Sequence, residues 1–260
     1  MEEKVYFWTS DNLKLCGILT SPIIPVKKCV VLCHGITVNK EEDGIFTELA
    51  RKLSDAGFAV FRFDFRGHGE SGGKSTDMTI IGETKDIEAA FEFLKNKGFD
   101  RFAIVAVSFA GGAVPFFIGK RISAAKALVL WNALIDYASH IHPITDWGIS
   151  NWGKPAFDRA KKFGFTEIGR RKFKVGLKLM EEVYTLKPWK KLLNISMPIL
   201  FIHGGKDTFV PYQDSVKYSK MVKNGSLVII KGAEHGFHGK KEDAEAADKA
   251  TINFLLETFR

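Results

Sequence analysis

The sequence is poor in cysteine, with 3 in 260 residues, at Cys16, Cys29 and Cys33. Cys29 and Cys33 would lie about 13 Å apart along a strand, which is too far for a disulfide. The acidic start at Met1–Lys4 is not followed by the short apolar region of a secretory signal. We therefore expect buried free thiols and a cytoplasmic protein.

The sequence also lacks a segment that is best explained as a membrane helix. Phe102–Gly119 has no charged residue over 18 positions, which is long enough to cross a membrane. The same segment contains Ser108, the Gly111-Gly112 pair and Pro115. A strand, a turn and a buried helix fit this composition better, so no transmembrane segment is expected. Internal repeats and low-complexity linkers are absent too, which excludes repeat architectures.

What is present is typical of a soluble globular protein, with 45% hydrophobic and 26% charged residues. Strand-like runs alternate with helical patterns, which predicts an α/β domain with a mostly parallel central sheet and helices on both faces. The expected elements are a hairpin over Val5–Thr20; strands over Cys29–Cys33, Ala59–Asp64, Phe102–Val107, Ala127–Trp131, Pro198–Ile202 and Ser226–Ile230; and helices over Ile45–Ala56, Thr79–Lys97 and Glu242–Phe259.

The interval from Asn132 to Asn194 interrupts this alternation. It is far longer than an ordinary connection, and it contains three tryptophans and helical spacing around Phe157–Leu179. We therefore expect a core domain of residues 1–131 and 195–260 with an insertion at 132–194. Its aromatic side chains either anchor the insertion to the core or line a pocket.

Residues capable of nucleophilic and acid–base chemistry follow three of the expected strands. They are Ser108, Asp207 and His235. A serine hydroxyl needs an adjacent base to become a good nucleophile, and an imidazole is suited to that role. A carboxylate behind the imidazole fixes its tautomer and stabilises the imidazolium. We assign Ser108 as nucleophile, His235 as general base and then acid, and Asp207 as the orienting carboxylate. The N–H of Phe109, the residue after the nucleophile, is expected to donate to the oxyanion.

The chain order of these residue types, serine, aspartate and then histidine, resembles that of the α/β-hydrolase family. Cys29–Ile36 ends in His-Gly-Ile and resembles the oxyanion loop of that family. Phe61–Gly72 is similar to the family's D-x-R-G-x-G-x-S stretch. The resemblance implies an α/β-hydrolase fold and a second oxyanion donor at the N–H of Ile36.

Among subfamilies, the chain is most similar to the small esterases and lipases of the cinnamoyl (feruloyl) esterase and monoacylglycerol lipase type. Where the family has G-x-S-x-G, this chain has Ala106-Val107-Ser108-Phe109-Ala110, and alanine still meets the need for small residues at the turn. The resemblance implies that residues 132–194 form a helical cap over the site. Substrate contacts are expected from Gly35, Trp131, Trp147 and Trp152.

Other residues offer alternatives for the same roles. His238 is the alternative base, and Asp214 is the alternative acid, although it falls in a predicted helix. His34 is expected to support the oxyanion loop, and His203 stands in a similar His-Gly pair at a strand end.

Two other classes of site were weighed against these. Gly67–Gly72 fits the dinucleotide pattern G-x-G-x-x-G, and His68–Ser75 fits a P-loop apart from its first glycine. Both motifs bind phosphate at a helix start, whereas Lys74–Asp77 has the composition of a loop and helix cap. His140 and His142 have no Cys or carboxylate cluster at ligand spacing. We therefore expect no organic cofactor and no metal.

Positive charge is concentrated in the insertion. The formal net charge is +8, and residues 132–194 contain 12 Lys and Arg against 6 Asp and Glu, most densely at Arg170–Lys174. A solvated helix face is the first interpretation, because cationic surface residues are ordinary. Weak contact with an anionic membrane surface is the second. Nucleic acid is not expected as a partner, because the predicted site needs none.

Together these patterns predict a serine carboxylesterase that acts on a small-molecule ester, with short to medium acyl chains, through an acyl-enzyme. The alternatives are an acyltransferase or thioesterase, a peptidase with the same three residues, and a non-catalytic small-molecule binding protein. A homodimer that forms through exposed aromatic residues of the cap is a further alternative.

Overall fold

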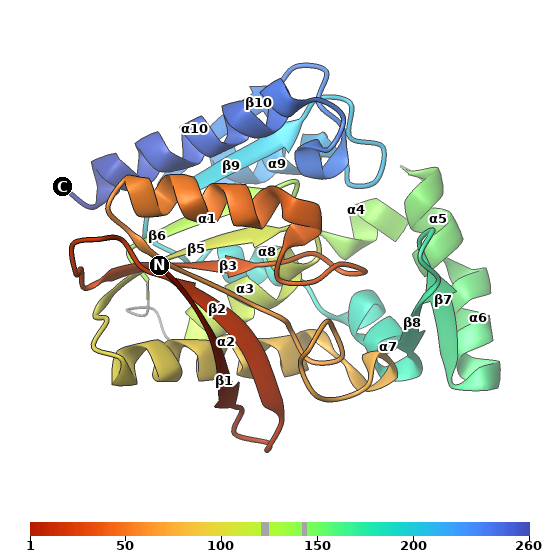
Figure 1. The fold of residues 1–260 in the computed structure, drawn as a ribbon. Helices are drawn as coiled ribbons and strands as arrows, with labels where there is room; N and C mark the ends of the chain where they lie inside the picture. The colour runs from red at the N-terminus through yellow and green to blue at the C-terminus, as the bar shows by residue number, and fades with distance from the viewer. Residues whose placement is uncertain (121–124, 142–144) are drawn as a thin grey trace.

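The computed structural model describes residues 1–120, 125–141 and 145–260. Its centre is an eight-stranded sheet in the order β1-β2-β4-β3-β5-β6-β9-β10 (Figure 1). The β1-β2 and β2-β4 pairs are antiparallel, and the other pairs are parallel. The strands are β1 (Glu2–Trp8), β2 (Lys14–Thr20), β3 (Lys28–Cys33), β4 (Ala59–Phe63), β5 (Arg101–Val107), β6 (Ala127–Trp131), β9 (Ile199–Gly204) and β10 (Gly225–Ile230).

Helices cover both faces of this sheet. α1 (Ile45–Asp55) and α10 (Lys241–Thr258) lie together on one face, and α2 (Ile80–Asn96) and α3 (Ala110–Lys120) lie on the other (Figure 1). Successive strand side chains point to opposite faces, so Val30 packs in the cluster with α1 while Val31 packs in the cluster with α2 and α3. The central strands are therefore apolar on both sides, as expected for a covered parallel sheet. The predicted α/β fold is confirmed.

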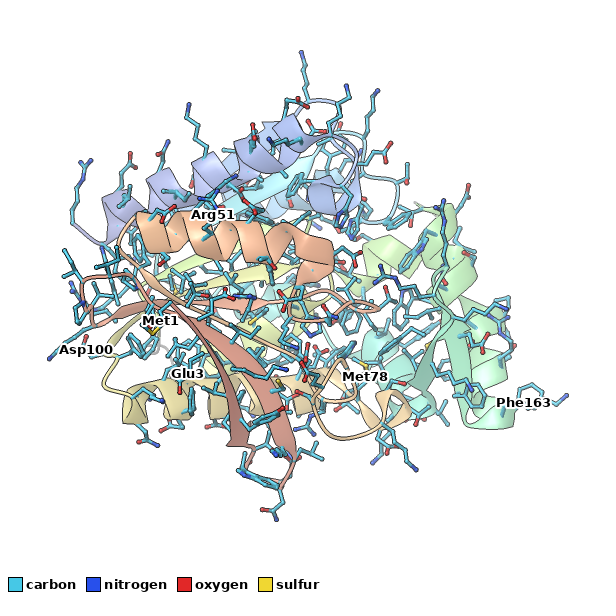
Figure 2. The ribbon with its side chains drawn as sticks, in the orientation of Figure 1. Met1, Glu3, Arg51, Met78, Asp100 and Phe163 are labelled. Atoms are coloured by element: carbon cyan, nitrogen blue, oxygen red, sulfur yellow. The ribbon has the colours of Figure 1, made fainter. Side chains whose placement is uncertain are left out.

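Between β6 and β9, most of the chain forms a group of elements at one end of the molecule, beside the sheet (Figure 1). Phe163, at the end of one of these helices, is 60% exposed and projects from the outer edge (Figure 2). The elements between β6 and β9 are α4 (Tyr137–Ile141), α5 (Asp146–Trp152), α6 (Lys154–Phe163), β7 (Phe165–Ile168), β8 (Phe173–Gly176), α7 (Leu177–Thr185) and α8 (Pro188–Leu192). The helix α9 (Tyr212–Met221) follows β9.

The helical spacing predicted around Phe157–Leu179 is wrong in its central part, where β7 and β8 form a two-stranded antiparallel sheet. α6 ends because Gly164 adopts a left-handed conformation (φ 82°), a common helix stop. The residues that follow are largely aromatic or β-branched, which favours strands. The basic stretch Arg170–Lys174 consequently forms the turn and the start of β8, and not a helix face.

Two further expectations concern buried and apolar segments. Cys16, Cys29 and Cys33 are buried and free, as predicted. The uncharged run from Phe102 to Gly119 divides into β5, a turn and α3. Over the three described ranges, none of the helices has both the length and the apolar character needed to cross a membrane.

Candidate active site

Ser108 stands at the turn between β5 and α3, in a left-handed backbone conformation (φ 50°). For a residue with a side chain this conformation costs on the order of 1–3 kcal/mol, so its surroundings must hold it in place. The N–H of Ser108 donates to the carbonyl of Trp131 (2.9 Å), and its own carbonyl accepts from the N–H of Leu134 (2.8 Å). A Cβ at Gly111 would lie 2.7 Å from that of Ala133, so only glycine permits this packing.

His235 follows β10 and begins the short helix η3 (His235–Phe237). Its Nε2 lies 2.9 Å from Oγ of Ser108, and its Nδ1 lies 2.7 Å from Oδ2 of Asp207. An ionised carboxylate only accepts hydrogen bonds, so Nδ1 carries the hydrogen and Nε2 accepts from the serine hydroxyl. In this tautomer, His235 is in position to take the proton of Ser108.

Asp207 follows β9, and its side chain is completely buried. Oδ1 accepts the N–H groups of Phe209 (2.8 Å) and Val210 (2.9 Å), while Oδ2 faces His235 and His203. Burial by itself would raise the pKa of this carboxyl. The positive charge of His235 and the hydrogen bonds from both histidines outweigh burial and hold the pKa of Asp207 well below its usual range. The carboxylate therefore stays ionised.

The loop after β3 passes close to Ser108. A Cβ on Gly35 would lie 3.2 Å from Cβ of Ser108, so the next residue, Ile36, is beside Ser108. Within residues 1–120, 125–141 and 145–260, the N–H groups of Ile36 and Phe109 have no hydrogen-bond acceptor. Both are free to donate to a substrate oxygen.

Two buried side chains hold this loop. Nδ1 of His34 donates to the carbonyl of Gly35 (2.7 Å), and its Nε2 accepts the N–H of Phe65 (3.0 Å). Burial lowers the pKa of His34 to about 4, which keeps the ring neutral at neutral pH. The carboxyl of Glu42 accepts the N–H of Gly35 (2.7 Å), and burial raises the pKa of Glu42 to about 7. The loop is thus fixed from both its carbonyl and its N–H side.

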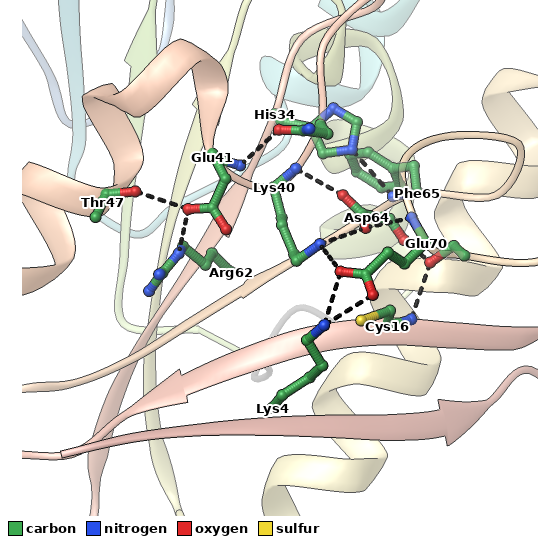
Figure 3. Close-up of polar contacts among 12 residues, drawn as sticks. Lys4, Cys16, His34, Lys40, Glu41, Thr47, Arg62, Asp64, Phe65 and Glu70 are labelled. Atoms are coloured by element: carbon green, nitrogen blue, oxygen red, sulfur yellow. Dashed lines mark hydrogen bonds and ion pairs between the residues drawn. The ribbon is translucent and has the colours of Figure 1, made fainter.

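In the loop after β3, Lys40 joins two carboxylates (Figure 3). Its Nζ lies 2.8 Å from Oδ2 of Asp64 and 3.0 Å from Oε1 of Glu70. Its backbone N–H donates to Oδ1 of Asp64 (2.7 Å). Cys16 lies beside the same carboxylates at metal-ligand spacing, but the ammonium of Lys40 already supplies positive charge there. This network ties the loop after β3 to the segment after β4.

The glycines of Gly67–Gly72 serve a tight turn. A Cβ at Gly67 would lie 2.7 Å from the backbone of Ser75, and one at Gly69 would lie 2.3 Å from the carboxylate of Asp64. No α-helix begins directly after this segment, because η2 (Ser75–Asp77) precedes α2. The phosphate motifs considered for this stretch therefore lack the helix start that they require.

A cavity of about 540 Å³ opens at Ser108 and His235. Two pairs of stacked aromatic rings form part of its wall. Phe109 stacks on Trp152 with ring centroids 5.5 Å apart, and Phe209 stacks on Trp147 at 5.1 Å. The size and the lining suit a small organic ligand with an apolar part.

Charged side chains line the outer part of the cavity. Arg170, Arg171 and Lys206 are exposed lining residues. Arg171 donates to the carboxylate of Asp43 (2.8 Å) and to the carbonyl of Thr37 (3.1 Å). It thereby connects the β7–β8 turn to the loop after β3.

The cavity brings together most of the residues predicted from the sequence. Ser108 and His235 line it together with Gly35, Ile36, Phe109, Trp147 and Trp152, whereas Asp207 contacts His235 from outside the lining.

Trp131 does not lie at this cavity, so the substrate contact predicted for it is wrong. It is 1% exposed, its indole N–H donates to Oγ1 of Thr251 in α10 (2.9 Å), and its ring packs against Phe237. The direction of its side chain on β6 turns it into the core beneath α10, away from the end of the sheet.

The residues considered as alternative base and acid make different contacts from His235 and Asp207. His238 lines the cavity, but His235 is the histidine that contacts Ser108. The carboxyl of Asp214, in α9, contacts the hydroxyl of Ser139. The side chain of His140 and the whole of residue 142 lie outside the described residues.

The lining residues that the sequence analysis did not assign to the site include Glu42, Arg171 and Phe209. Phe209 had a detectable signal, since it is an aromatic residue two positions after the predicted acid. Glu42 had none, because nothing in the pattern separates it from its neighbour Glu41.

Comparison with known proteins decides the family. Residues 24–162 match the family described as serine aminopeptidase, S33, and residues 184–260 match the dienelactone hydrolase family. The first match covers more than half of the chain. The chain belongs to the serine aminopeptidase, S33, family.

Curated relatives and solved structures are similar to this α/β hydrolase over most of its length. It is 25% identical over 212 residues to the uncharacterized protein YqkD of Bacillus subtilis, covering 79% of this chain and 64% of YqkD. It is 25% identical over 221 residues to the human serine hydrolase BPHL, covering 80% and 73% of the two chains. The structure of Est1E from Butyrivibrio proteoclasticus with ferulic acid bound has a TM-score of 0.83 at 24% identity, covering 98% and 99%. The α/β-hydrolase fold and the resemblance to hydrolases of this type are confirmed.

Proposed function

We propose that this hydrolase is a serine carboxylesterase in which Ser108, His235 and Asp207 act as the catalytic triad. The observation that carries the proposal is the continuous series of contacts from Oγ of Ser108 through His235 to Asp207, at 2.9 and 2.7 Å, where the cavity opens. An adjacent base activates the neutral serine hydroxyl, and the carboxylate orients that base.

In this mechanism, Nε2 of His235 takes the proton as Oγ of Ser108 attacks the ester carbonyl carbon. The N–H groups of Ile36 and Phe109 donate to the oxyanion of the tetrahedral intermediate. The imidazolium, stabilised by Asp207, then gives its proton to the departing alcohol. Water attacks the acyl-enzyme with His235 again as base, which releases the carboxylic acid and restores the serine.

We propose that residues 132–194 act as a cap on a core of residues 1–131 and 195–260. Leu134, Trp147 and Trp152 from this interval line the cavity. Aromatic walls around about 540 Å³ favour short to medium acyl chains. The cationic residues of the β7–β8 turn would also allow weak contact with an anionic membrane surface.

Hydrolysis rates on p-nitrophenyl esters from acetyl to palmitoyl test the proposal. We expect turnover on the shorter esters, and a fall in kcat of about 10⁶-fold in Ser108→Ala if the triad acts as a unit. Ser54→Ala, in α1 and outside the cavity lining, is the matched control and should behave like the wild type. Wild-type turnover in Ser108→Ala would refute the assignment.

The family description favours peptide hydrolysis at an N-terminus as a second candidate. Glu42 and Glu234 line the cavity, and a carboxylate is a suitable partner for a substrate ammonium group. Aminoacyl p-nitroanilides and the matched aminoacyl esters separate the two functions. An esterase should cleave only the esters efficiently, whereas an aminopeptidase should cleave both and should lose turnover on blocked N-termini.

A further inference from the structure

His203 is a buried histidine outside the three proposed catalytic residues, and it contacts the same carboxylate oxygen as His235. Its Nε2 lies 3.1 Å from Oδ2 of Asp207, and its Nδ1 lies 2.7 Å from Oγ of Ser215 in α9. His203 is completely buried and Ser215 is 1% exposed. A continuous series of polar contacts therefore runs from Ser215 to Ser108 through two histidines and one carboxylate.

The surroundings of His203 determine where its hydrogen lies. Nε2 faces the carboxylate of Asp207 and, at 3.2 Å, the carbonyl of Val210. Both groups can only accept, so Nε2 carries a hydrogen in either protonation state of the ring. When the ring is neutral, Nδ1 accepts from the hydroxyl of Ser215. Ser215 thus favours the tautomer in which His203 donates to Asp207.

With this donor, all four acceptor positions of the Asp207 carboxylate are occupied. Oδ1 accepts two backbone N–H groups, from Phe209 and Val210, and Oδ2 accepts from His235 and His203. A carboxylate has about four lone-pair positions, so none is left to draw the group into another orientation. Loss of the His203 donor would leave the buried charge partly unsatisfied and held by three hydrogen bonds where there were four.

We infer that His203 is a positioning residue that, supported by Ser215, holds Asp207 in the orientation in which it orders His235. The inference rests on the proposed function, because it assigns His203 a role through the proposed triad. His203 has no contact with Ser108 and does not line the cavity, so it acts on Asp207 and not on the substrate.

The inference predicts a change in kcat with little change in KM. His203→Phe keeps a ring and removes the donor, and we expect kcat on the best p-nitrophenyl ester to fall about 10-fold. His203→Gln offers an amide donor and should recover most of this loss.

Two serines of α9 provide a matched pair. Ser215→Ala removes the partner of His203, and we expect kcat to fall about 3-fold. Ser219 is also buried, but its hydroxyl bonds only to the carbonyl of Val216 in its own helix, so Ser219→Ala should keep wild-type kcat. In a His203→Phe background, Ser215→Ala should cause no further loss, because the two act through one contact.

Unfolding curves show whether each variant is folded, and Ser215→Ala carries the test if His203→Phe does not fold. Equal kcat losses in Ser215→Ala and Ser219→Ala would overturn the inference. If Ser108→Ala is inactive but His203→Phe has wild-type kcat, the inference alone fails. If Ser108→Ala keeps wild-type turnover, the proposed function fails first and the inference fails with it.

Discussion

Replacement of Glu42 by glutamine should change the pH dependence of stability in a direction that the structure determines. Glu42 is 5% exposed, and burial raises the pKa of its carboxyl from 4.5 to about 7. Below pH 4.5 the carboxyl is protonated in both the folded and the unfolded protein, and no penalty arises. As the pH rises from 4.5 towards 7, the carboxyl ionises in the unfolded chain while it stays protonated in the folded protein. This difference favours the unfolded chain and lowers the free energy of unfolding.

The size of the loss follows from the shift. Each pKa unit corresponds to about 1.4 kcal/mol, so a shift from 4.5 to about 7 is equivalent to about 3 kcal/mol in the free energy of unfolding. Glutamine has no charge at any pH, and its carbonyl can still accept the N–H of Gly35. We therefore expect Glu42→Gln to be more stable than the wild type by about 3 kcal/mol at pH 8, and by much less at pH 5.

Urea unfolding at pH 5 and pH 8, followed by fluorescence and circular dichroism, measures this difference when the two transitions coincide. Glu48→Gln is the matched control, because Glu48 lies in α1 and its side chain is 60% exposed. Its stability should stay within about 0.5 kcal/mol of the wild type at both pH values. A Glu42→Gln difference that is the same at pH 5 and pH 8 would show that the buried carboxyl does not titrate in this range, and the reasoning would be wrong.

Three further predictions follow from the packing around the site. Trp131→Phe should lower the free energy of unfolding by about 1 kcal/mol, because Thr251 loses its hydrogen-bond partner. The value of kcat/KM on p-nitrophenyl esters should stay unchanged, and a large loss of activity would contradict the placement of Trp131 in the core. Lys40→Met should cost about 3–5 kcal/mol in urea unfolding, because it leaves the buried carboxylate of Asp64 without its ammonium partner; a cost close to zero would show that the pair is not buried in solution. Trp147→Ala removes part of the cavity wall, so the preferred p-nitrophenyl ester should have a longer acyl chain; an unchanged preference would mean that Trp147 does not limit the chain.

The sequence by itself determined the order of the core elements and the identity of the three residues that are joined through His235. Buried parallel strands are short apolar runs, and a residue that follows such a run lies at the edge of the sheet. Ser108, Asp207 and His235 could be named on this basis, since each has a local signal at the end of β5, β9 or β10. Ile36 and Phe109 could be named because they adjoin recognisable segments.

Only the tertiary structure decided what surrounds each side chain. Trp131 adjoins the site in sequence but turns into the core, and Glu42 looks like any surface acid but is buried beside Gly35. The contact of His203 with Asp207 depends on how the loop after β9 folds back, which no local pattern encodes. Burial and hydrogen-bond partners are set by residues far apart in the chain, and they fix the protonation state and the orientation of each group. The chemistry available at the site is therefore a property of the packed fold, whereas the residue types that provide it can already be identified in the sequence.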